Sequence, residues 1–204
     1  MIISLENISK RFNAEWVFRN VSVSLEHDQV YAITGPNGTG KSTLLRIIAG
    51  QLLPSGGRIR HSGHSVHDVF YCVSYAAPYL DIPEEFTLEE VIRFNRQFKT
   101  WRNSLTSEEI VLMTGLEKHR RRPVKTFSSG MRQRVKLTLA MLTHSDILIL
   151  DEPTMNLDSA GVNWYQELLA RNSAHRVVVI GSNMEREYTQ ATAVIDIMQF
   201  KPSP

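Results

Sequence analysis

The residues best suited to chemistry lie in one glycine-rich stretch, Gly35-Pro36-Asn37-Gly38-Thr39-Gly40-Lys41-Ser42-Thr43. Four residues separate Gly35 from Gly40, and Lys41 and Ser42 follow at once, which is the spacing of a phosphate-binding loop. In such a loop backbone N–H groups surround an anion, the lysine reaches the β- and γ-phosphates, and the serine hydroxyl binds Mg²⁺. The stretch therefore predicts a site for a nucleoside triphosphate with Mg²⁺, in which Lys41 also acts on the reacting phosphate.

The segments beside this stretch must place it between a strand and a helix. Residues 30–34, Val-Tyr-Ala-Ile-Thr, are a short β-prone run, and residues 44–49 have the apolar pattern of a buried helix. This order puts the loop at the positive end of a helix dipole, where anions are stabilised. A glycine-rich turn that matches the spacing by coincidence is the alternative.

A pair of carboxylates supplies the second half of the predicted site. Asp151 and Glu152 follow residues 147–150, Ile-Leu-Ile-Leu, a run typical of a strand buried on both faces of a parallel sheet. Ligands bind at this end of such strands, so Asp151 can hold Mg²⁺ opposite Ser42. Glu152 is then free to activate the attacking water. The alternative is an acidic pair that faces solvent.

Four motifs, taken in order, resemble those of the ATP-binding-cassette (ABC) transporter family. They are the glycine loop, Ser128-Ser129-Gly130, Leu150-Asp151-Glu152-Pro153 and Asn156-Leu157-Asp158. The resemblance runs from Phe12 to about Asn183 and implies a nucleotide-binding subunit, with ATP and Mg²⁺ as cofactors. It also implies an ATPase that dimerises with a second nucleotide-binding domain around Mg·ATP and drives a separate transmembrane permease subunit.

The resemblance implies roles for further residues. Phe12 lies where the family has the aromatic ring that stacks on adenine, with Trp16 as a weaker candidate and core packing as the alternative for both. Ser128-Ser129-Gly130 stands at the family's signature motif, where a serine and backbone amides at a helix start hold the γ-phosphate of ATP bound by the opposite subunit. Asp158 belongs to the loop that runs across the dimer seam.

The sequence departs from the family at positions near the γ-phosphate. Pro78 occupies the place of the Q-loop glutamine, although proline has neither an N–H nor a polar side chain. Ser182 replaces the switch histidine, so a hydroxyl stands where the family has a group that can be charged. Because losing one preorganised transition-state contact typically costs ~10²–10³ in rate, we expect a competent but slow ATPase. An ATP-dependent scaffold or regulatory subunit with little hydrolysis is the alternative.

The pattern of elements predicts an α/β fold: a P-loop NTPase core with a mostly parallel sheet, an antiparallel β subdomain and an inserted helical subdomain. Alternation at 2–8 and 21–25, with a further strand region up to residue 73, places the antiparallel part at about 1–30 and 55–75. The helical subdomain covers about 78–126, and the core takes the rest of a single domain, 1–204. Buried strands at 147–150, 177–180 and 193–198 alternate with helices.

Capping boxes mark the helices of the helical subdomain. Residues 87–90 and 106–109 both have the Thr-x-x-Glu spacing in which the side chains at N-cap and N3 satisfy backbone N–H groups. Val91, Phe94 and Phe98 form an apolar stripe on the first of these helices, which we assign to the core.

The composition and net charge limit the classes of partner that the chain is expected to have. The net charge of +2 over 204 residues argues against nucleic acid as the main partner. A single cysteine, no signal-peptide pattern and no run near the ~18 apolar residues of a membrane span favour a cytoplasmic chain, peripheral to the membrane through its permease subunit. A non-transport ABC ATPase acting on nucleic acid or in cofactor assembly is a third hypothesis, without the tandem cassettes or long inserts common there.

A group of histidines and a basic run are expected to be solvated surface features. His61, His64 and His67 are three residues apart, but no cysteine or carboxylate completes a tidy metal set, so we expect solvated hairpin histidines. The basic run at 118–125 is expected to be a solvated face.

Overall fold

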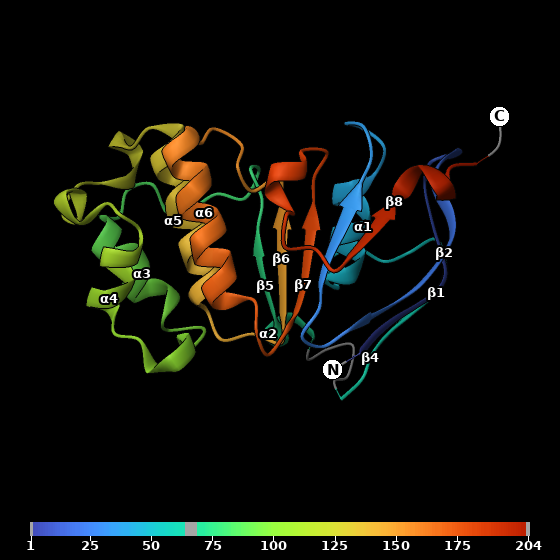
Figure 1. Ribbon diagram of the computed structural model, residues 1–204, viewed down its shortest axis with the longest axis horizontal. Helices are drawn as coiled ribbons and strands as arrows, with labels where there is room; N and C mark the ends of the chain where they lie inside the picture. Colours follow the sequence, from blue (N-terminus) through green and yellow to red (C-terminus); the bar gives the residue numbers. More distant parts are fainter. Residues whose placement is uncertain (1, 64–68, 203–204) are drawn as a thin grey trace.

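A parallel sheet of five strands forms the centre of the chain (Figure 1), in a computed structural model that describes residues 2–63 and 69–202. The strand order is β5 (Val73–Ala76), β6 (Ile147–Asp151), β7 (Val177–Gly181), β3 (Val30–Thr34) and β8 (Ala193–Asp196). Every residue of β6 and β7 is buried, which explains why their sequences are continuously apolar. The predicted α/β fold is confirmed, although β8 ends before the turn η5 (Ile197–Phe200) instead of continuing to residue 198.

A smaller antiparallel sheet lies at the other end of the molecule from α3 and α4 (Figure 1). It joins β2 (Glu15–Glu26), β1 (Ile2–Phe12) and β4 (Gly56–His61). The strand expected at 69–73 is wrong, because α2 (Val69–Cys72) is helical and β5 pairs in parallel with β6. Only Val69 of its apolar run is buried, while Phe70 and Tyr71 face solvent, so the run does not form the half-buried strand that its β propensity suggested.

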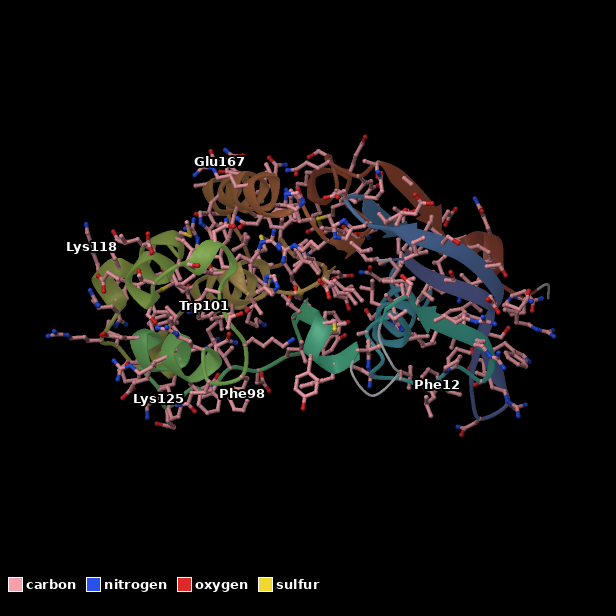
Figure 2. The ribbon with its side chains drawn as sticks, turned by 90° about the horizontal axis from the view of Figure 1, so that it is seen from below. Phe12, Phe98, Trp101, Lys118, Lys125 and Glu167 are labelled. Atoms are coloured by element: carbon pink, nitrogen blue, oxygen red, sulfur yellow. The ribbon has the colours of Figure 1, made fainter. Side chains whose placement is uncertain are left out.

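The helical subdomain is inserted between β5 and β6. It contains α3 (Leu88–Asn95), α4 (Ser107–Met113) and the turns η1 (Arg102–Ser104), η2 (Glu117–His119) and η3 (Val124–Thr126). Both predicted capping boxes are present, at Thr87 and Thr106. The core assignment is correct for Val91 but wrong for the two rings, since Phe94 is 38% and Phe98 66% exposed (Figure 2). These rings stack edge to face on the outside of the subdomain.

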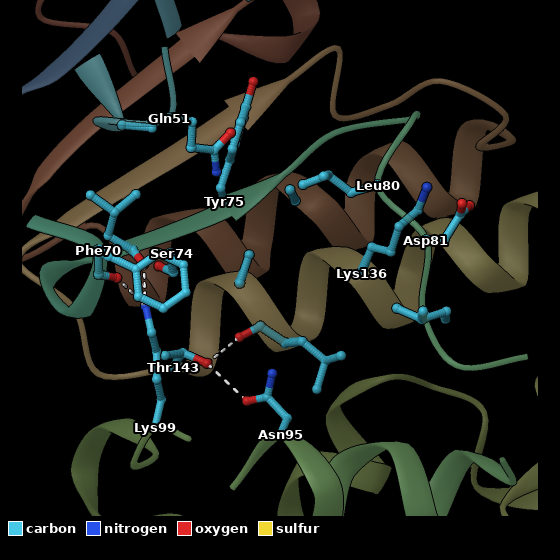
Figure 3. A pocket seen from close by; sticks show the side chains of 16 residues that line it. Gln51, Phe70, Ser74, Tyr75, Leu80, Asp81, Asn95, Lys99, Lys136 and Thr143 are labelled. Carbon is cyan, nitrogen blue, oxygen red and sulfur yellow. Dashed lines mark hydrogen bonds between the residues drawn. The ribbon is translucent and has the colours of Figure 1, made fainter. Parts of the chain in front are cut away.

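A groove of about 300 Å³ lies where the helical subdomain meets β5 and α5 (Ser129–Leu142) (Figure 3). Lys99 enters it from one side and donates hydrogen bonds to Phe70 O and Val73 O. From α5, Lys136 donates to Pro78 O at 2.8 Å. Burial lowers the pKa of both lysine side chains. The groove therefore combines apolar walls with two cations that are hydrogen-bonded to backbone carbonyls.

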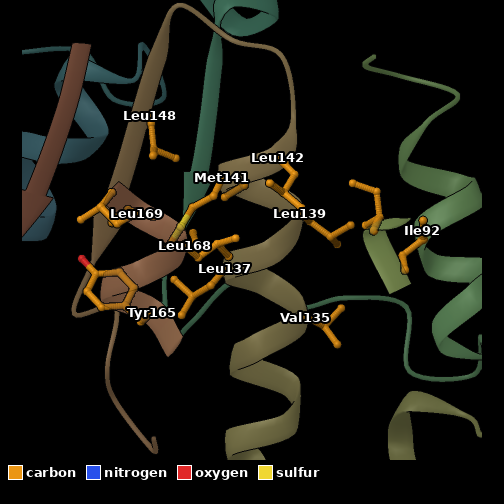
Figure 4. Close-up of a cluster of buried hydrophobic side chains, with 14 of the residues drawn as sticks. Ile92, Val135, Leu137, Leu139, Met141, Leu142, Leu148, Tyr165, Leu168 and Leu169 are labelled. Carbon is orange, nitrogen blue, oxygen red and sulfur yellow. The ribbon is translucent and has the colours of Figure 1, made fainter. Parts of the chain in front are cut away.

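Helices cover both faces of the parallel sheet. Leu148 and Leu150 pack with α5 and α6 (Ser159–Asn172), in the cluster shown in Figure 4. Ile147 and Ile149 point to the opposite face and pack with α1 (Lys41–Ile48) and the antiparallel sheet. Within residues 2–63 and 69–202, no helix has the combined length and apolar character needed to cross a bilayer.

His61 and the basic run have partners within the described part of the chain. His64 and His67 lie outside the described residues. His61 is not solvated as expected: it is buried, with Nε2 2.9 Å from Ile48 O, because the end of β4 packs near the end of α1. The part of the chain that the structure describes contains no metal-binding group of three or more His, Cys, Asp or Glu. Arg120 from the basic run pairs with Glu108 at 2.6 Å.

Candidate functional site

The glycine loop joins an inner strand of the parallel sheet to a helix, in the predicted order of strand, loop and helix. It begins after β3, and its last three residues form the start of α1. Gly35, Gly38 and Gly40 have φ angles of 136°, 79° and 103°, in the left-handed region that favours glycine. A Cβ at Gly40 would lie only 2.4 Å from Val17 Cγ1, so the β1–β2 hairpin packs directly on this end of the loop. No side chain other than hydrogen fits there.

Lys41 holds its ammonium group over the loop. The side chain is 4% exposed, and Nζ donates to Gly35 O at 2.8 Å and to Pro36 O at 3.3 Å. Asn37 Oδ1 lies 3.5 Å from the same nitrogen, and Glu152 Oε1 lies 4.0 Å away. Of these partners only Glu152 is a charged group, so an incoming phosphate would meet an ammonium group that is paired with one carboxylate at 4.0 Å.

Asp151 ends β6 with its side chain almost fully buried, 1% exposed. Burial raises the pKa of its carboxyl group above the ordinary value, the Glu152 charge acts in the same direction, and the Ser42 hydroxyl opposes them. Its Oδ1 atom is buried without a hydrogen-bond partner. A buried polar atom left unpaired is destabilising unless a ligand satisfies it. The donor set of Ser42 and Asp151 fits Mg²⁺, which prefers hard oxygen ligands.

Glu152 adopts an unusual backbone conformation beside Asp151. Its φ is 43°, rare for a residue other than glycine, and its N–H donates to Gly181 O at 2.8 Å. The side chain is 34% exposed and lies near Lys41. Such strain is often found where a side chain must be aimed at a site. The Glu152 carboxylate therefore lies beside the lysine of the glycine loop.

The signature motif begins α5 and packs on the backbone of Asn156. Ser128 caps the helix by accepting from Met131 N at 3.2 Å, and both Ser128 and Ser129 are exposed. A Cβ at Gly130 would lie 2.7 Å from Asn156 O, so only glycine allows this contact. Exposed amides at the start of a long helix can bind an anion from outside the chain.

Asp158 serves the next helix. Its Oδ1 accepts from Gly161 N at 2.7 Å and caps α6. One carboxylate oxygen of the predicted dimer-seam residue is thus engaged in holding the loop in shape.

The two candidate rings for adenine stacking differ in availability. Phe12 is the last residue of β1 and is 50% exposed, at the end of the molecule away from the helical subdomain (Figure 2). Lys10 Nζ lies 5.0 Å from the centre of its ring. The centre of the Trp16 ring lies 5.5 Å from the guanidinium carbon of Arg11 and 4.9 Å from that of Arg19. Phe12 is therefore the more available of the two for stacking on a base.

Sequence reasoning missed two tyrosines beside Pro78. Tyr79 donates to Asp151 Oδ2 at 3.3 Å, and the Tyr75 hydroxyl lies 2.5 Å from that of Tyr79. Burial raises the pKa of both phenols, so they remain hydrogen-bond donors at neutral pH. The available signal was a pair of tyrosines four residues apart, next to a strand that neighbours the one carrying Asp151.

In the segment after β7, Ser182, the residue predicted at the switch position, and its neighbour Asn183 have different surroundings. Ser182 is fully buried, and its Oγ accepts from Met184 N at 2.9 Å. Asn183 is exposed, and its Nδ2 lies 3.5 Å from Asn37 Oδ1 in the glycine loop. The side chain that reaches the phosphate loop is thus the one that follows Ser182.

Sequence comparisons place these features among known proteins. The family model described as ABC transporter matches residues 18–155. The chain is 29% identical over 204 residues to the uncharacterized ABC transporter ATP-binding protein YcbN of Bacillus subtilis (strain 168), covering 97% of this chain and 66% of that protein. It is 32% identical over 189 residues to the cytochrome c biogenesis ATP-binding export protein CcmA of Chelativorans sp. (strain BNC1), covering 90% and 92%.

A solved structure supports the same fold. The dimeric structure of a post-hydrolysis state of the ATP-binding cassette MJ0796, bound to ADP and Pi, matches with a TM-score of 0.83 and 21% identity, over 96% of this chain and 94% of that chain. The chain spans only about two thirds of YcbN, so its partners and substrates do not follow from that likeness. Because the family model matches more than half of the residues, the chain belongs to the ABC transporter family, among its ATP-binding proteins.

Proposed function

We propose that this chain binds and hydrolyses ATP as a subunit of an ABC transporter. The observation that carries the proposal is the meeting, at one edge of the sheet, of the glycine loop, Lys41, Ser42 and the carboxylates of Asp151 and Glu152. The buried, unpaired Asp151 Oδ1 supports a cation site at this edge. Phosphate release by the purified chain, measured with and without Mg²⁺, tests the proposal.

Each residue of the site has a part in hydrolysis. The loop amides and Lys41 bind and orient the phosphates, while Ser42 and Asp151 would hold Mg²⁺. When bound, Mg²⁺ neutralises charge that develops on the transferring phosphate. Glu152 orients the attacking water and accepts its proton. Phe12 stacks on the adenine, a contact worth about 1–3 kcal/mol per base.

Closure around ATP requires a second nucleotide-binding domain. The hydrogen bond described for Ser128 Oγ stays within its own helix, and the exposed surface of Ser128 and Ser129 faces outward. MJ0796 is a dimer in its ADP- and Pi-bound structure, which supports the same assembly here. Ser128-Ser129-Gly130 of one domain would then hold the γ-phosphate bound by the other, with Asp158 anchoring the loop at the seam.

Asn183 is our candidate for the γ-phosphate contact, in preference to Ser182. Replacing Asn183 by alanine is expected to lower phosphate release by about 10²–10³-fold, the usual cost of one preorganised transition-state contact. Ser182→Ala should lower it less, because the serine hydroxyl is occupied with Met184 N. Steady-state phosphate release by both variants checks this. The reverse order of effects would return the role to Ser182.

The groove beside the helical subdomain is our candidate for permease docking. Phe70, which lines the groove, is 69% exposed, and so are Tyr71 and Phe98, at 68% and 66%, which each adjoin a lining residue in the sequence. Exposed rings at its border suit an apolar partner segment. Tyr79, 50% exposed, extends the same surface toward the nucleotide site. A permease bound here would keep the chain at the membrane surface.

Phe98→Glu is expected to remove most of the permease that co-purifies with the tagged chain from its native membranes, because a charge replaces an exposed ring that the permease would cover. Phosphate release by the isolated chain should not change. Leu112→Glu makes the same kind of change at a 56% exposed position on α4 and should retain the permease. Equal recovery with both variants would contradict this docking surface.

An ATP-dependent scaffold is the second candidate function. Pro78, which offers no side-chain polar group, and the occupied Ser182 hydroxyl favour it. A scaffold would bind Mg·ATP and dimerise without Mg²⁺-dependent phosphate release, so the hydrolysis assay separates the two functions.

A further inference from the structure

Two phenol groups lie beside the carboxylate of Asp151. The Tyr79 hydroxyl donates to Oδ2 at 3.3 Å, and the Tyr75 hydroxyl lies 3.4 Å from the same oxygen. The two hydroxyls are 2.5 Å apart, and the rings meet edge to face at 82°. The phenols and the carboxylate therefore form one hydrogen-bonded cluster.

The two oxygens of Asp151 have different surroundings as a result. Oδ2 lies beside both phenols, whereas Oδ1 is buried with no hydrogen-bond partner. A donor on one oxygen restrains the rotation of the carboxylate and leaves the other oxygen for a ligand. Pro78, between the tyrosines, cannot provide such a donor.

The backbone that carries these tyrosines is anchored. Tyr75 belongs to β5, which pairs with β6, the strand that ends in Asp151. Next to Tyr79, the carbonyl of Pro78 accepts a hydrogen bond from Lys136 Nζ of α5 at 2.8 Å. Both phenols are thus held by paired or tethered backbone, so their contact with Asp151 does not depend on a free loop.

We propose that the Tyr75–Tyr79 hydroxyl pair is the positioning group for Asp151 and determines how tightly Mg²⁺ is held beside the bound nucleotide. The inference rests on the proposed function of the site. The pair acts through Asp151, and among the described hydrogen bonds the two hydroxyls contact only each other and that carboxylate. Nucleotide binding without metal should therefore be independent of the pair.

Equilibrium binding of a β,γ-imido analogue of ATP tests this, measured by calorimetry in excess EDTA and again in excess Mg²⁺. Tyr79→Phe is expected to reduce the gain in affinity on adding Mg²⁺ by about 10-fold, as loss of an outer donor to a metal ligand commonly does. Its affinity in EDTA should match that of the wild type. Tyr75→Phe keeps the Tyr79 contact and should reduce the gain by about 2–10-fold.

Tyr71→Phe is the matched control, because it removes a phenol hydroxyl from a 68% exposed ring on α2, outside the cluster. Its Mg²⁺ gain should equal that of the wild type. A tyrosine that only packs would lower the melting temperature of the nucleotide-free chain and leave the gain unaltered. That result for Tyr79→Phe would overturn the inference, as would an equal loss of affinity in EDTA and in Mg²⁺.

The failure of this inference can be told from that of the proposed function. If the wild-type chain binds the analogue and gains affinity from Mg²⁺ while Tyr79→Phe keeps the same gain, only the role of the tyrosines is lost. If the wild-type chain binds no analogue in either solution, the proposed function fails and the inference falls with it.

Discussion

Replacing Glu152 by glutamine is expected to lower steady-state phosphate release by about 10²–10⁴-fold, the usual contribution of a positioned general base. The glutamine side chain has the same size as glutamate, but its amide group cannot take a proton from water. Glu152 is 34% exposed at the site and 4.0 Å from Lys41, and its amide nitrogen is fixed to Gly181. The loop and Asp151 should stay in place, so ATP binding should be retained.

A comparison at another surface carboxylate separates this effect from a change of charge. Glu167→Gln, at a 72% exposed position on α6, removes the same charge from a helix that carries none of the proposed site residues and should keep wild-type turnover. All chains are purified in the same way. Activity from a contaminating ATPase would then remain in the Glu152→Gln preparation and be detected there. Equal phosphate release by wild type and Glu152→Gln would contradict the proposed hydrolysis.

Lys41→Ala is expected to weaken ATP binding by about 10–100-fold, since a hydrogen bond to a charged group contributes about 1.5–3 kcal/mol. The lysine also ties the loop together through Gly35 O and Pro36 O, at 2.8 and 3.3 Å. Its loss therefore removes both a charge and the shape of the cradle. Calorimetric titration with ATP in Mg²⁺ measures the change.

The control for this variant is Lys118→Ala, an exposed lysine of η2 in the helical subdomain. This substitution also removes a positive charge, but from the helical subdomain and not from the glycine loop, so ATP affinity should be unchanged. Melting curves of both variants show whether Lys41→Ala is folded. A folded Lys41→Ala with wild-type ATP affinity would mean that the triphosphate binds elsewhere.

Much of the fold was predictable because its signals are local. The glycine loop, its strand and its helix lie within one short stretch, and their spacing alone predicts their conformation. The capping boxes at Thr87 and Thr106 are equally local and are present as expected. Continuous apolar runs identified β6 and β7 because both faces of these strands are covered.

The features that escaped prediction depend on contacts between distant segments. Tyr79 and Asp151 are 72 residues apart along the chain, so nothing near either residue announces their contact. Phe98 lies beyond the end of α3 at Asn95, so the helical periodicity that grouped it with Val91 does not apply to it. Likewise, Asn183 rather than Ser182 reaches the glycine loop because the first residue after β7 is buried.

The central claim is that the glycine loop of one chain binds a triphosphate that the signature serine of a neighbouring chain covers. A crystal structure of Glu152→Gln grown with Mg²⁺ and ATP tests it most directly. We predict the phosphates within residues 35–43, Mg²⁺ beside Ser42 and Asp151, and Ser128 of a second nucleotide-binding domain at the γ-phosphate. An empty loop, or nucleotide bound at another surface, would contradict the account.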